Sequence, residues 1–310
     1  MDNIFTGRIA GQHHGIYDVL INGEEYSATL SGKLKKSDSM IAVGDYAQVL
    51  LDGDTAVITE MQPRTGVIAR KTAGRSEAMQ VIAANVDIVF ICMALDNNYN
   101  MRRLERYIAA VGGSGARPVI LLTKADIAER ACDPAETAQA RRAEINAVYP
   151  DMQVILCSSL DRRGYDEAAA LIGPGITAVF TGSSGVGKST LINDVTGSAM
   201  RTGAVREDSR GRHTTTHRQL IPLKNGGAVI DTPGMRELAI YDGDVEGAFP
   251  DIEELAKGCR FSDCTHRKEP GCAVIRALDE GALEEKRYES YLKLKVEKRQ
   301  RIEKRMVFKR

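Results

Sequence analysis

The segment GSSGVGKS, residues 182–189, has the residue types and the spacing that hold phosphate groups. Its glycines let the backbone bend so that successive N–H groups face an anion. Lys188 would place its charge beside the β- and γ-phosphates of a nucleotide, and Ser189 would offer its hydroxyl to Mg²⁺. The predicted phosphate-binding residues are Gly182, Ser183, Ser184, Gly185, Val186, Gly187, Lys188, Ser189 and Thr190.

A second motif, DTPG at residues 231–234, follows the apolar run GAVI. Asp231 would reach a bound Mg²⁺ through a water molecule, and the N–H of Gly234 would approach the γ-phosphate. Alone, Asp-Thr-Pro-Gly also suits a plain turn. Its position after the phosphate-binding segment favours the nucleotide role.

The polar segment RGRHTTTH, residues 210–217, lies between these two motifs. It is poor in helix-forming residues, which favours a loop. A hydroxyl from such a loop, that of Thr214 or Thr215, would complete the Mg²⁺ shell. An exposed loop without any ligand role is the alternative interpretation.

The segment TKAD, residues 123–126, ends another apolar run and carries an aspartate suited to guanine. The two oxygens of Asp126 can accept from the ring N–H and the exocyclic amine of guanine, a paired contact that adenine does not offer. The stem of Lys124 can lie along the base. The alternative interpretation is an aspartate that caps a helix after a strand. The predicted base-binding residues are Thr123, Lys124, Ala125 and Asp126.

The order of these motifs differs from that of an ordinary GTPase, in which the phosphate-binding segment comes first. Here TKAD and a short polar loop, CSS at residues 157–159, precede it. We expect Ser158 and Ser159 to brace the base. A domain tolerates a cut at a surface loop when its former termini lie close and are joined, so the loops can still meet in space. The sequence therefore predicts a circularly permuted GTPase domain.

Apolar runs of strand length alternate with helical stretches from residue 81 onward. This alternation predicts a parallel sheet that helices cover on both faces. Such sheets bind ligands at the carboxyl ends of their strands, where the motifs above lie. The predicted strands are 86–95, 117–123, 153–159, 176–182 and 227–234, and the predicted helices are 101–111, 136–149 and 164–172.

Residues 4–62 contain short alternating apolar runs that Gly, Asn and Asp separate. This pattern favours a five-stranded barrel of the oligonucleotide/oligosaccharide-binding type, the OB-fold. Residues 1–63 hold four Lys or Arg and nine Asp or Glu, a net charge of −5, which is not an obvious charge for a nucleic-acid binder. The polar, basic segment 63–80 is predicted to be a connector.

The spacing C-x4-C-x-H-x5-C near the C-terminus gathers four soft metal ligands in a short segment. Three thiolates and one imidazole favour a closed, structural Zn²⁺ site. The alternative is a set of free cysteines near a loop histidine. The predicted ligands are Cys259, Cys264, His266 and Cys272, whereas Cys92, Cys132 and Cys157 are predicted to be small core residues.

The composition, with 43% apolar and 27% charged residues, is typical of a globular protein. No apolar run reaches the length of a membrane span, and no signal peptide is evident, so we expect a cytoplasmic protein without a membrane partner. We also expect a monomer. Residues 286–310 hold eleven Lys or Arg and three Glu, a net charge of +8. This basic, predicted helical tail favours a polyanionic partner, with a solvated helix as the alternative.

The order TKAD, CSS, GSSGVGKST, GRHTTT, DTPG, with the flanking segment RSEAMQVIAANVDIVF, resembles the family of ribosome small-subunit-dependent GTPase A. The resemblance covers essentially the whole chain and includes the zinc motif, ligand for ligand. It implies the α/β class, with a circularly permuted P-loop GTPase domain, an N-terminal OB-fold β-barrel and a small C-terminal α-helical zinc-binding domain. The expected domain bounds are 1–65, 66–244 and 245–310.

The same resemblance implies an enzyme that hydrolyses GTP to GDP and phosphate during late maturation of the 30S ribosomal subunit. The subunit and its 16S rRNA would be the partners, the subunit would stimulate hydrolysis, and Zn²⁺ and Mg²⁺ would be the cofactors. The alternative is an RNA-binding assembly module in which nucleotide only gates docking. A kinase or ATPase built on the phosphate-binding segment is disfavoured by TKAD.

Two positions depart from familiar GTPase motifs. Thr123 stands where the base motif ordinarily has Asn, and Met235 stands where many GTPases have a water-orienting Gln. Because Met cannot orient water by hydrogen bonding, we expect slow intrinsic hydrolysis. Lys188 and His213 are the candidate catalytic residues, and a loop histidine without a catalytic role is the equal alternative for His213.

Overall fold

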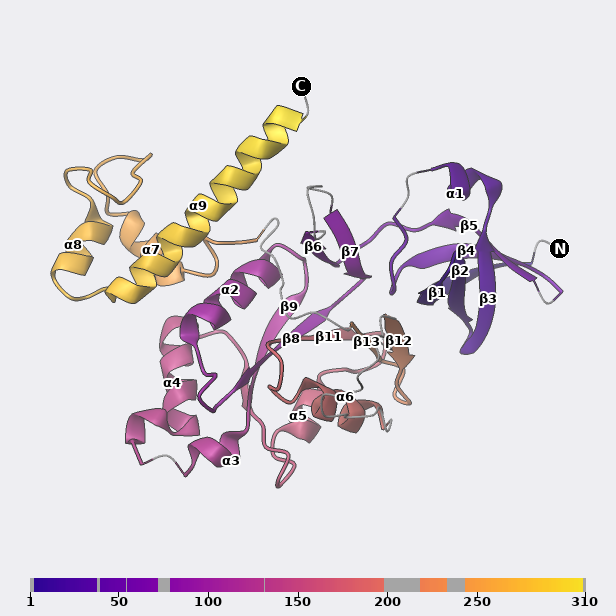
Figure 1. The fold of residues 1–310 in the computed structure, drawn as a ribbon, viewed down its shortest axis with the longest axis horizontal. Coiled ribbons are helices and arrows are strands. Elements are labelled where there is room, and N and C mark those ends of the chain that lie inside the picture. The colour runs from indigo at the N-terminus through magenta and orange to yellow at the C-terminus, as the bar shows by residue number, and fades with distance from the viewer. Residues whose placement is uncertain are drawn as a thin grey trace, which may run out of the picture.

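The protein folds into three parts that lie in a row (Figure 1). A closed barrel forms one end, a six-stranded sheet with helices forms the middle, and a helical part forms the other end. The computed structural model describes residues 3–37, 40–53, 55–71, 79–130, 132–197, 218–232 and 243–308. None of the helices in these ranges combines the length and the apolar character that crossing a membrane requires.

The N-terminal part is a closed barrel with the strand order β1-β2-β3-β5-β4, as the alternating apolar runs predict. Its strands are β1 (Ile4–His13), β2 (Ile16–Ile21), β3 (Glu24–Leu30), β4 (Tyr46–Asp52) and β5 (Thr55–Met61), with α1 (Gly32–Lys36) after β3. Side chains alternate between the two faces of each strand. The inward set includes Ile9, Val19, Val49 and Ile58, all of them fully buried.

The middle part is built on a sheet with the order β10-β9-β8-β11-β13-β12. The strands are β8 (Ile88–Ala94), β9 (Arg117–Thr123), β10 (Val154–Leu156), β11 (Thr177–Thr181), β12 (Gln219–Pro222) and β13 (Ala228–Asp231). All neighbouring pairs are parallel except β12 with β13. The parallel strands were predicted from their apolar runs, whereas the short antiparallel edge strand β12 was not.

Helices cover both faces of this sheet. They are α2 (Met101–Gly112), α3 (Ala125–Ala128), α4 (Ala138–Val148), α5 (Tyr165–Ala170) and α6 (Lys188–Thr196), with the short 3₁₀ helix η1 (Pro134–Glu136) before α4. Ile91 of β8 packs in one core with residues of α2 and α4, and its neighbour Phe90 packs in another core with residues of α5 and α6. Such alternation makes β8 apolar along its whole length.

The strand order explains how a permuted chain closes the site. β11, which leads into the phosphate-binding segment, lies at the centre of the sheet between β8 and β13. These flanking strands come first and last among the parallel strands of the chain. Segments far apart in the sequence therefore meet on either side of β11.

Two predictions about other segments are wrong. Residues 63–80 are not a plain connector, because β6 (Val67–Lys71) and β7 (Met79–Ala84) form an antiparallel hairpin. The hairpin was missed because the segment is polar overall, although its two strands bury the apolar side chains of Ile68 and Ile82. Cys132 is exposed in the loop after α3 and is not a core residue, whereas Cys92 and Cys157 are buried as predicted.

The C-terminal part consists of α7 (Pro250–Ala256), α8 (Ala273–Asp279) and the long α9 (Glu285–Phe308). Part of the predicted apolar stripe is buried there, because Leu283, Tyr291 and Leu294 are at most 5% exposed. Ile302 and Met306 were also predicted to belong to this stripe, but their side chains are not among those that the structure describes.

A buried ion network attaches this C-terminal part to the sheet domain. The guanidinium of Arg287 on α9 donates to Glu105 on α2 at 2.6 Å and to both carboxylate oxygens of Asp251 on α7, at 2.5 and 2.7 Å. Arg287 and Glu105 are only 8% and 2% exposed. Because desolvated charges are stable only when paired, the network holds α2, α7 and α9 together.

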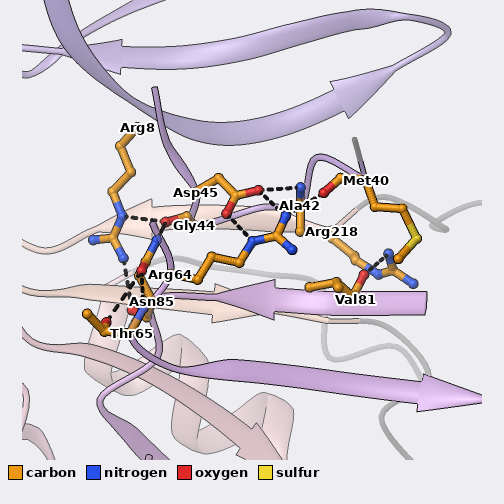
Figure 2. Close-up of polar contacts among 10 residues, drawn as sticks. All are labelled: Arg8, Met40, Ala42, Gly44, Asp45, Arg64, Thr65, Val81, Asn85 and Arg218. Atoms are coloured by element: carbon orange, nitrogen blue, oxygen red, sulfur yellow. Dashed lines mark hydrogen bonds and ion pairs between the residues drawn. The ribbon is translucent and has the colours of Figure 1, made fainter. Parts of the chain in front are cut away.

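A second network joins the barrel to the sheet domain (Figure 2). Arg8 of β1 donates a 2.6 Å hydrogen bond to Thr177, the first residue of β11. Asn85, which follows β7, donates to the carbonyl of Gly44 at 3.0 Å and accepts from the N–H of Thr65 at 3.0 Å. Gly44 has a φ of +94°, and a Cβ there would lie 2.2 Å from the carbonyl oxygen of Ala84. Only glycine permits this close approach.

Candidate nucleotide-binding site

The motifs predicted to bind nucleotide lie at the carboxyl ends of neighbouring parallel strands. TKAD begins at the last residue of β9, CSS follows β10, GSSGVGKS follows β11, and DTPG begins at the last residue of β13. In the parallel register, Ala94 at the end of β8 pairs with Thr123 at the end of β9. The sheet thus brings together segments that the chain separates, at the edge where such sheets bind ligands.

The phosphate-binding segment has the backbone that its glycines predict. Gly182 has a φ of +140°, and a Cβ there would lie 2.3 Å from the carbonyl oxygen of Cys92. Gly187, with a φ of +95°, is the N-terminal cap of α6. A helix begins at Lys188, so its free N–H groups and partial positive charge point to the loop.

The side chain of Lys188 folds back onto the phosphate-binding segment. Its ammonium donates to the carbonyl oxygens of Gly182 at 2.7 Å and of Ser183 at 2.6 Å. Ser189 and Thr190, the next two residues of α6, are exposed. The ammonium therefore lies inside the loop that is predicted to bind phosphates. This position suits the predicted role of Lys188.

Asp231 lies at the end of β13 in an environment poor in water. Burial raises the pKa of its carboxyl, and this effect outweighs the opposing effects of the Thr232 N–H and the charge of Lys188. A carboxylate that has lost hydration gains more from a nearby divalent cation than a solvated one does. This electrostatic setting suits the predicted link to Mg²⁺.

Thr123 connects the base motif to the phosphate-binding segment. Its hydroxyl lies 2.6 Å from the carbonyl oxygen of Val186, and the side chain is 5% exposed. A longer contact of 3.4 Å joins the same hydroxyl to the carbonyl of Met93. The hydroxyl that distinguishes Thr from an apolar residue is therefore used here, which the sequence did not reveal.

Lys124 and Asp126 flank the start of α3. Lys124 has left-handed backbone, with a φ of +58°, and its ammonium lies 2.7 Å from Asp96 Oδ2. The carboxylate of Asp126 is half-buried and, within the described part of the chain, takes part in no hydrogen bond or ion pair. That leaves its two oxygens available to a ligand.

The CSS loop is fastened to the base motif through the backbone. The N–H of Ala125 donates to the carbonyl of Cys157 at 3.0 Å, which extends the pairing of β9 with β10. Ser158 is buried and its Oγ accepts from the N–H of Leu160 at 3.2 Å, whereas Ser159 is exposed. Ser158 thus shapes the loop, and Ser159 is the more accessible of the two serines.

Consecutive arginines brace the same loop from two sides. Arg162 pairs through both terminal nitrogens with Asp194 on α6, and Arg163 pairs in the same way with Glu129 after α3. Bidentate pairs of this kind fix orientation as well as distance. The loop is thereby tied both to the helix of the phosphate-binding segment and to the helix of the base motif.

Four predicted site residues lie outside the described residues: His213, Thr214, Thr215 and Gly234. Sequence reasoning also missed several residues that position the site, namely Asp96, Arg162, Arg163, Glu129 and Asp194. Only Asp96 gave a usable signal, because it is an acidic residue directly after the apolar run of β8. The arginine pairs join loops whose proximity depends on the fold.

The cysteine and histidine cluster forms a compact ligand set. One ligand atom from each of Cys259, Cys264, His266 and Cys272 lies within 4.8 Å of the others. The sulfurs of Cys259 and Cys272 are 3.8 Å apart, and each is 3.6 Å from His266 Nδ1. A tetrahedral Zn²⁺, with Zn–S of about 2.3 Å and Zn–N of about 2.0–2.1 Å, would require separations of about 3.8 and 3.6 Å. The cluster could therefore hold a zinc ion.

Neighbouring groups hold these ligands in place. His266 has a φ of +59°, and Tyr288 of α9 donates to its carbonyl at 2.6 Å. Cys272 is the N-terminal cap of α8, where its sulfur accepts from the N–H of Ile275. The side chain of Glu269 accepts from N–H groups of the loop between the ligands, including that of Arg267 at 2.9 Å.

Comparisons with known proteins agree with this geometry. The family model described as RsgA GTPase matches residues 61–241. Small ribosomal subunit biogenesis GTPase RsgA 2 of Lactiplantibacillus plantarum is 45% identical over 298 residues, which cover 94% of this chain and 82% of the relative. A protein named small ribosomal subunit biogenesis GTPase RsgA from Methanosarcina acetivorans is 42% identical, with coverages of 93% and 78%.

Two solved structures share the fold. The crystal structure of YjeQ from Thermotoga maritima is similar with a TM-score of 0.71 and 25% identity, over 95% of this chain and 98% of that one. The structure of YloQ, described as a circularly permuted GTPase, has a TM-score of 0.69 and 28% identity, over 96% of each chain. The family match, the permuted strand order and the assembled motifs lead to one conclusion: this chain belongs to the RsgA GTPase family and is a GTP-hydrolysing enzyme.

Proposed function

We propose that this GTPase acts on the 30S ribosomal subunit during its late maturation, with hydrolysis of GTP to GDP and phosphate stimulated by the subunit. The names of its relatives as small ribosomal subunit biogenesis GTPases support the pathway. The main structural support for GTP binding is the hydrogen bond from the Thr123 hydroxyl to the carbonyl of Val186. This bond brings the base motif and the phosphate-binding segment together.

Nucleotide recognition divides between two sides of the site. On the base side, Asp126 reads the guanine edge, Lys124 lies along the base, and Thr123, Ala125, Ser158 and Ser159 shape the slot. On the phosphate side, residues 182–190 bind the phosphates, with Lys188 as their main cation. Two observations support this division: the Asp126 carboxylate has no polar partner among the described residues, and the Lys188 ammonium lies at the phosphate-binding segment.

Catalysis requires Mg²⁺, which supplies charge stabilisation at the phosphates when it is bound. Ser189 and either Thr214 or Thr215 would supply its direct ligands, Asp231 would hold it through water, and the N–H of Gly234 would approach the γ-phosphate. Met235 offers no hydrogen bond to the attacking water, so His213 or the ribosomal partner completes the site. Slow turnover without the subunit follows from this arrangement.

The C-terminal part would bind Zn²⁺ through Cys259, Cys264, His266 and Cys272, and four protein ligands would give the ion a structural role. Residues 1–65 form the barrel domain, 66–244 the GTPase domain and 245–310 the zinc domain. The basic residues of α9 contact phosphates of the 16S rRNA, a type of contact that positions a protein without reading sequence. The protein works as a cytoplasmic monomer.

The decisive experiment measures GTP hydrolysis by the purified protein with and without 30S subunits. A large increase in turnover on adding subunits is expected, and 50S subunits serve as the matched control. Equal rates under all conditions would rule the proposal out. If a Lys188→Ala variant fully supports 30S maturation, the alternative of an RNA-binding assembly module gated by nucleotide gains the support instead.

Guanine recognition is tested separately with an Asp126→Asn variant. An amide at this position offers one acceptor and one donor, so preference should move from GTP towards xanthosine triphosphate. Binding of GTP, xanthosine triphosphate and ATP is compared by calorimetry for both proteins. An unchanged preference for GTP refutes the assignment of Asp126.

A further inference from the structure

The Lys124 side chain of the base motif is held by a carboxylate from outside that motif. Lys124 Nζ lies 2.7 Å from Oδ2 of Asp96. Asp96 follows β8 and Lys124 follows β9, and these strands are neighbours whose last residues pair. The ion pair therefore joins the carboxyl ends of two parallel strands at the proposed guanine site.

The carboxylate of Asp96 is oriented by its own turn. Its Oδ1 accepts from the N–H of Asn98 at 2.8 Å, and its carbonyl accepts from the N–H of Tyr99 at 2.8 Å. The preceding residue, Leu95, donates to the carbonyl of Thr123 at 2.8 Å. The turn and the neighbouring strand ends therefore fix the orientation of the Asp96 carboxylate.

The lysine is constrained from its other end as well. Lys124 has a φ of +58°, a left-handed conformation that side-chain-bearing residues seldom adopt. Its carbonyl accepts from the N–H of Ile127 in α3. With the backbone fixed at one end and the ammonium held at the other, the four-carbon stem between them has little freedom. The side chains of Lys124 and Asp96 are 33% and 20% exposed, so the pair lies at the surface of the site.

We infer that Asp96 is a positioning residue for guanine nucleotides. By holding the ammonium of Lys124, it fixes the lysine stem as one face of the slot in which the base lies. This inference rests on the proposed base-binding role of Lys124. The stem would contact the flat face of the base and would not read its edges, whereas Asp126 reads the edges. Asp96 therefore raises the affinity for the nucleotide but does not contribute to the selection of guanine over other purines that fit the slot.

The test compares GDP and inosine diphosphate binding to an Asp96→Asn variant by calorimetry. Asn keeps the shape and can still accept from the N–H of Asn98, but it removes the charge that holds Lys124. Both dissociation constants should rise by the same factor, about fivefold for a partly exposed ion pair. The KM for GTP should rise by that factor while kcat stays within about twofold. An Asp96→Glu variant should restore most of the affinity.

A double-mutant cycle separates this role from a general loss of structure. In a Lys124→Met background, Asp96→Asn should cause no further loss of GDP affinity. Glu254→Gln, which breaks the exposed Lys257–Glu254 pair in the C-terminal part, is the matched control and should leave GDP affinity unchanged.

Three outcomes for Asp96→Asn overturn the inference. The GDP affinity is unchanged, or GDP binds more tightly because the ion pair had restrained Lys124. The third is that the variant loses affinity for GDP but not for inosine diphosphate. If the unmodified protein binds no GDP, the proposed function fails first. If it binds GDP and Asp96→Asn binds equally well, only the role of Asp96 fails.

Discussion

The hydroxyl of Thr123 donates a 2.6 Å hydrogen bond to the carbonyl of Val186, a residue 63 positions later in the chain. This bond joins the strand that carries the base motif to the loop that carries the phosphate-binding segment. It also explains why Thr can stand where an Asn is usual, because a short hydroxyl is sufficient when the two loops approach this closely. The two halves of the candidate nucleotide site are thereby held in one geometry.

Replacing Thr123 with Val should weaken nucleotide binding, because the variant keeps the shape of the side chain and removes the donor to Val186. Loss of a buried hydrogen bond of about 0.5–1.5 kcal/mol corresponds to about a twofold to thirteenfold loss of GDP affinity. Calorimetric titration with GDP measures this loss, and Thr123→Ser should retain most of the affinity.

Thr59→Val is the matched control for this prediction. Thr59 donates to the carbonyl of Gln48 at 3.1 Å in the barrel, so its loss should affect stability and leave GDP affinity unchanged. Equal GDP affinity in Thr123→Val and the unmodified protein would show that the contact is only structural.

The general architecture was predictable because its signals are local. Strictly apolar runs such as the one that became β8 identify parallel strands, and glycines at fixed spacing identify a loop that needs φ above zero, as Gly182 and Gly187 confirm. The hairpin of β6 and β7 was missed because its apolar alternation is short and lies within a polar, basic segment.

The connections between segments were not predictable, since they depend on which loops the fold brings together. Nothing in the sequence pairs Arg162 with Asp194, or Arg287 with Glu105, 182 positions away. Asp96 was visible as an acidic residue after a strand, but its partner Lys124 follows a different strand. Such pairs are a property of the sheet order rather than of any local pattern.

Replacing Cys264 with Ala should remove the zinc ion and unfold the C-terminal part. Zn²⁺ binding to such ligand sets contributes about 10–16 kcal/mol near pH 7, which is comparable to the whole free energy of unfolding of a typical domain. Metal content by mass spectrometry and thermal unfolding by circular dichroism measure the two effects. Cys132→Ala, which alters an exposed cysteine outside the cluster, should retain both the zinc and the melting temperature. Retention of stoichiometric zinc by Cys264→Ala would contradict the assignment.

Replacing Arg64 with Met should destabilise the barrel domain. Two nitrogens of Arg64 lie 2.6 Å from the carboxylate oxygens of Asp45, which is fully buried (Figure 2). Leaving a buried carboxylate without its partner costs about 3–5 kcal/mol. Urea unfolding measures the loss of stability.

The double variant Arg64→Met, Asp45→Asn is the control for this prediction. It removes the unpaired charge and keeps an acceptor for the N–H of Ala42, which donates to Asp45 at 2.8 Å. It should therefore be more stable than Arg64→Met alone. A double variant that is no more stable would show that lost packing, rather than the stranded charge, accounts for the effect.

The loss in free energy of unfolding caused by replacing Arg287 with Met should depend on pH. Burial raises the pKa of Glu105 above its ordinary value, although hydrogen bonds to Ser290 and Arg287 and the charge of Arg287 oppose the shift. In the variant the charge of Arg287 is gone, so this pKa should rise further. A carboxyl whose pKa is higher in the folded than in the unfolded protein stabilises the fold at low pH. That stability is lost as pH rises from the unfolded value, about 4.3, through the folded one.

The destabilisation caused by Arg287→Met should therefore be smaller at pH 5 than at pH 8, because protonated Glu105 carries no unpaired charge. Urea unfolding at the two pH values gives the difference, with the unmodified protein measured in parallel. Adding Glu105→Gln to Arg287→Met should reduce the pH dependence, since the amide does not titrate. If the cost of Arg287→Met is equal at both pH values, Glu105 is not the group that Arg287 neutralises, and Asp251 becomes its principal partner.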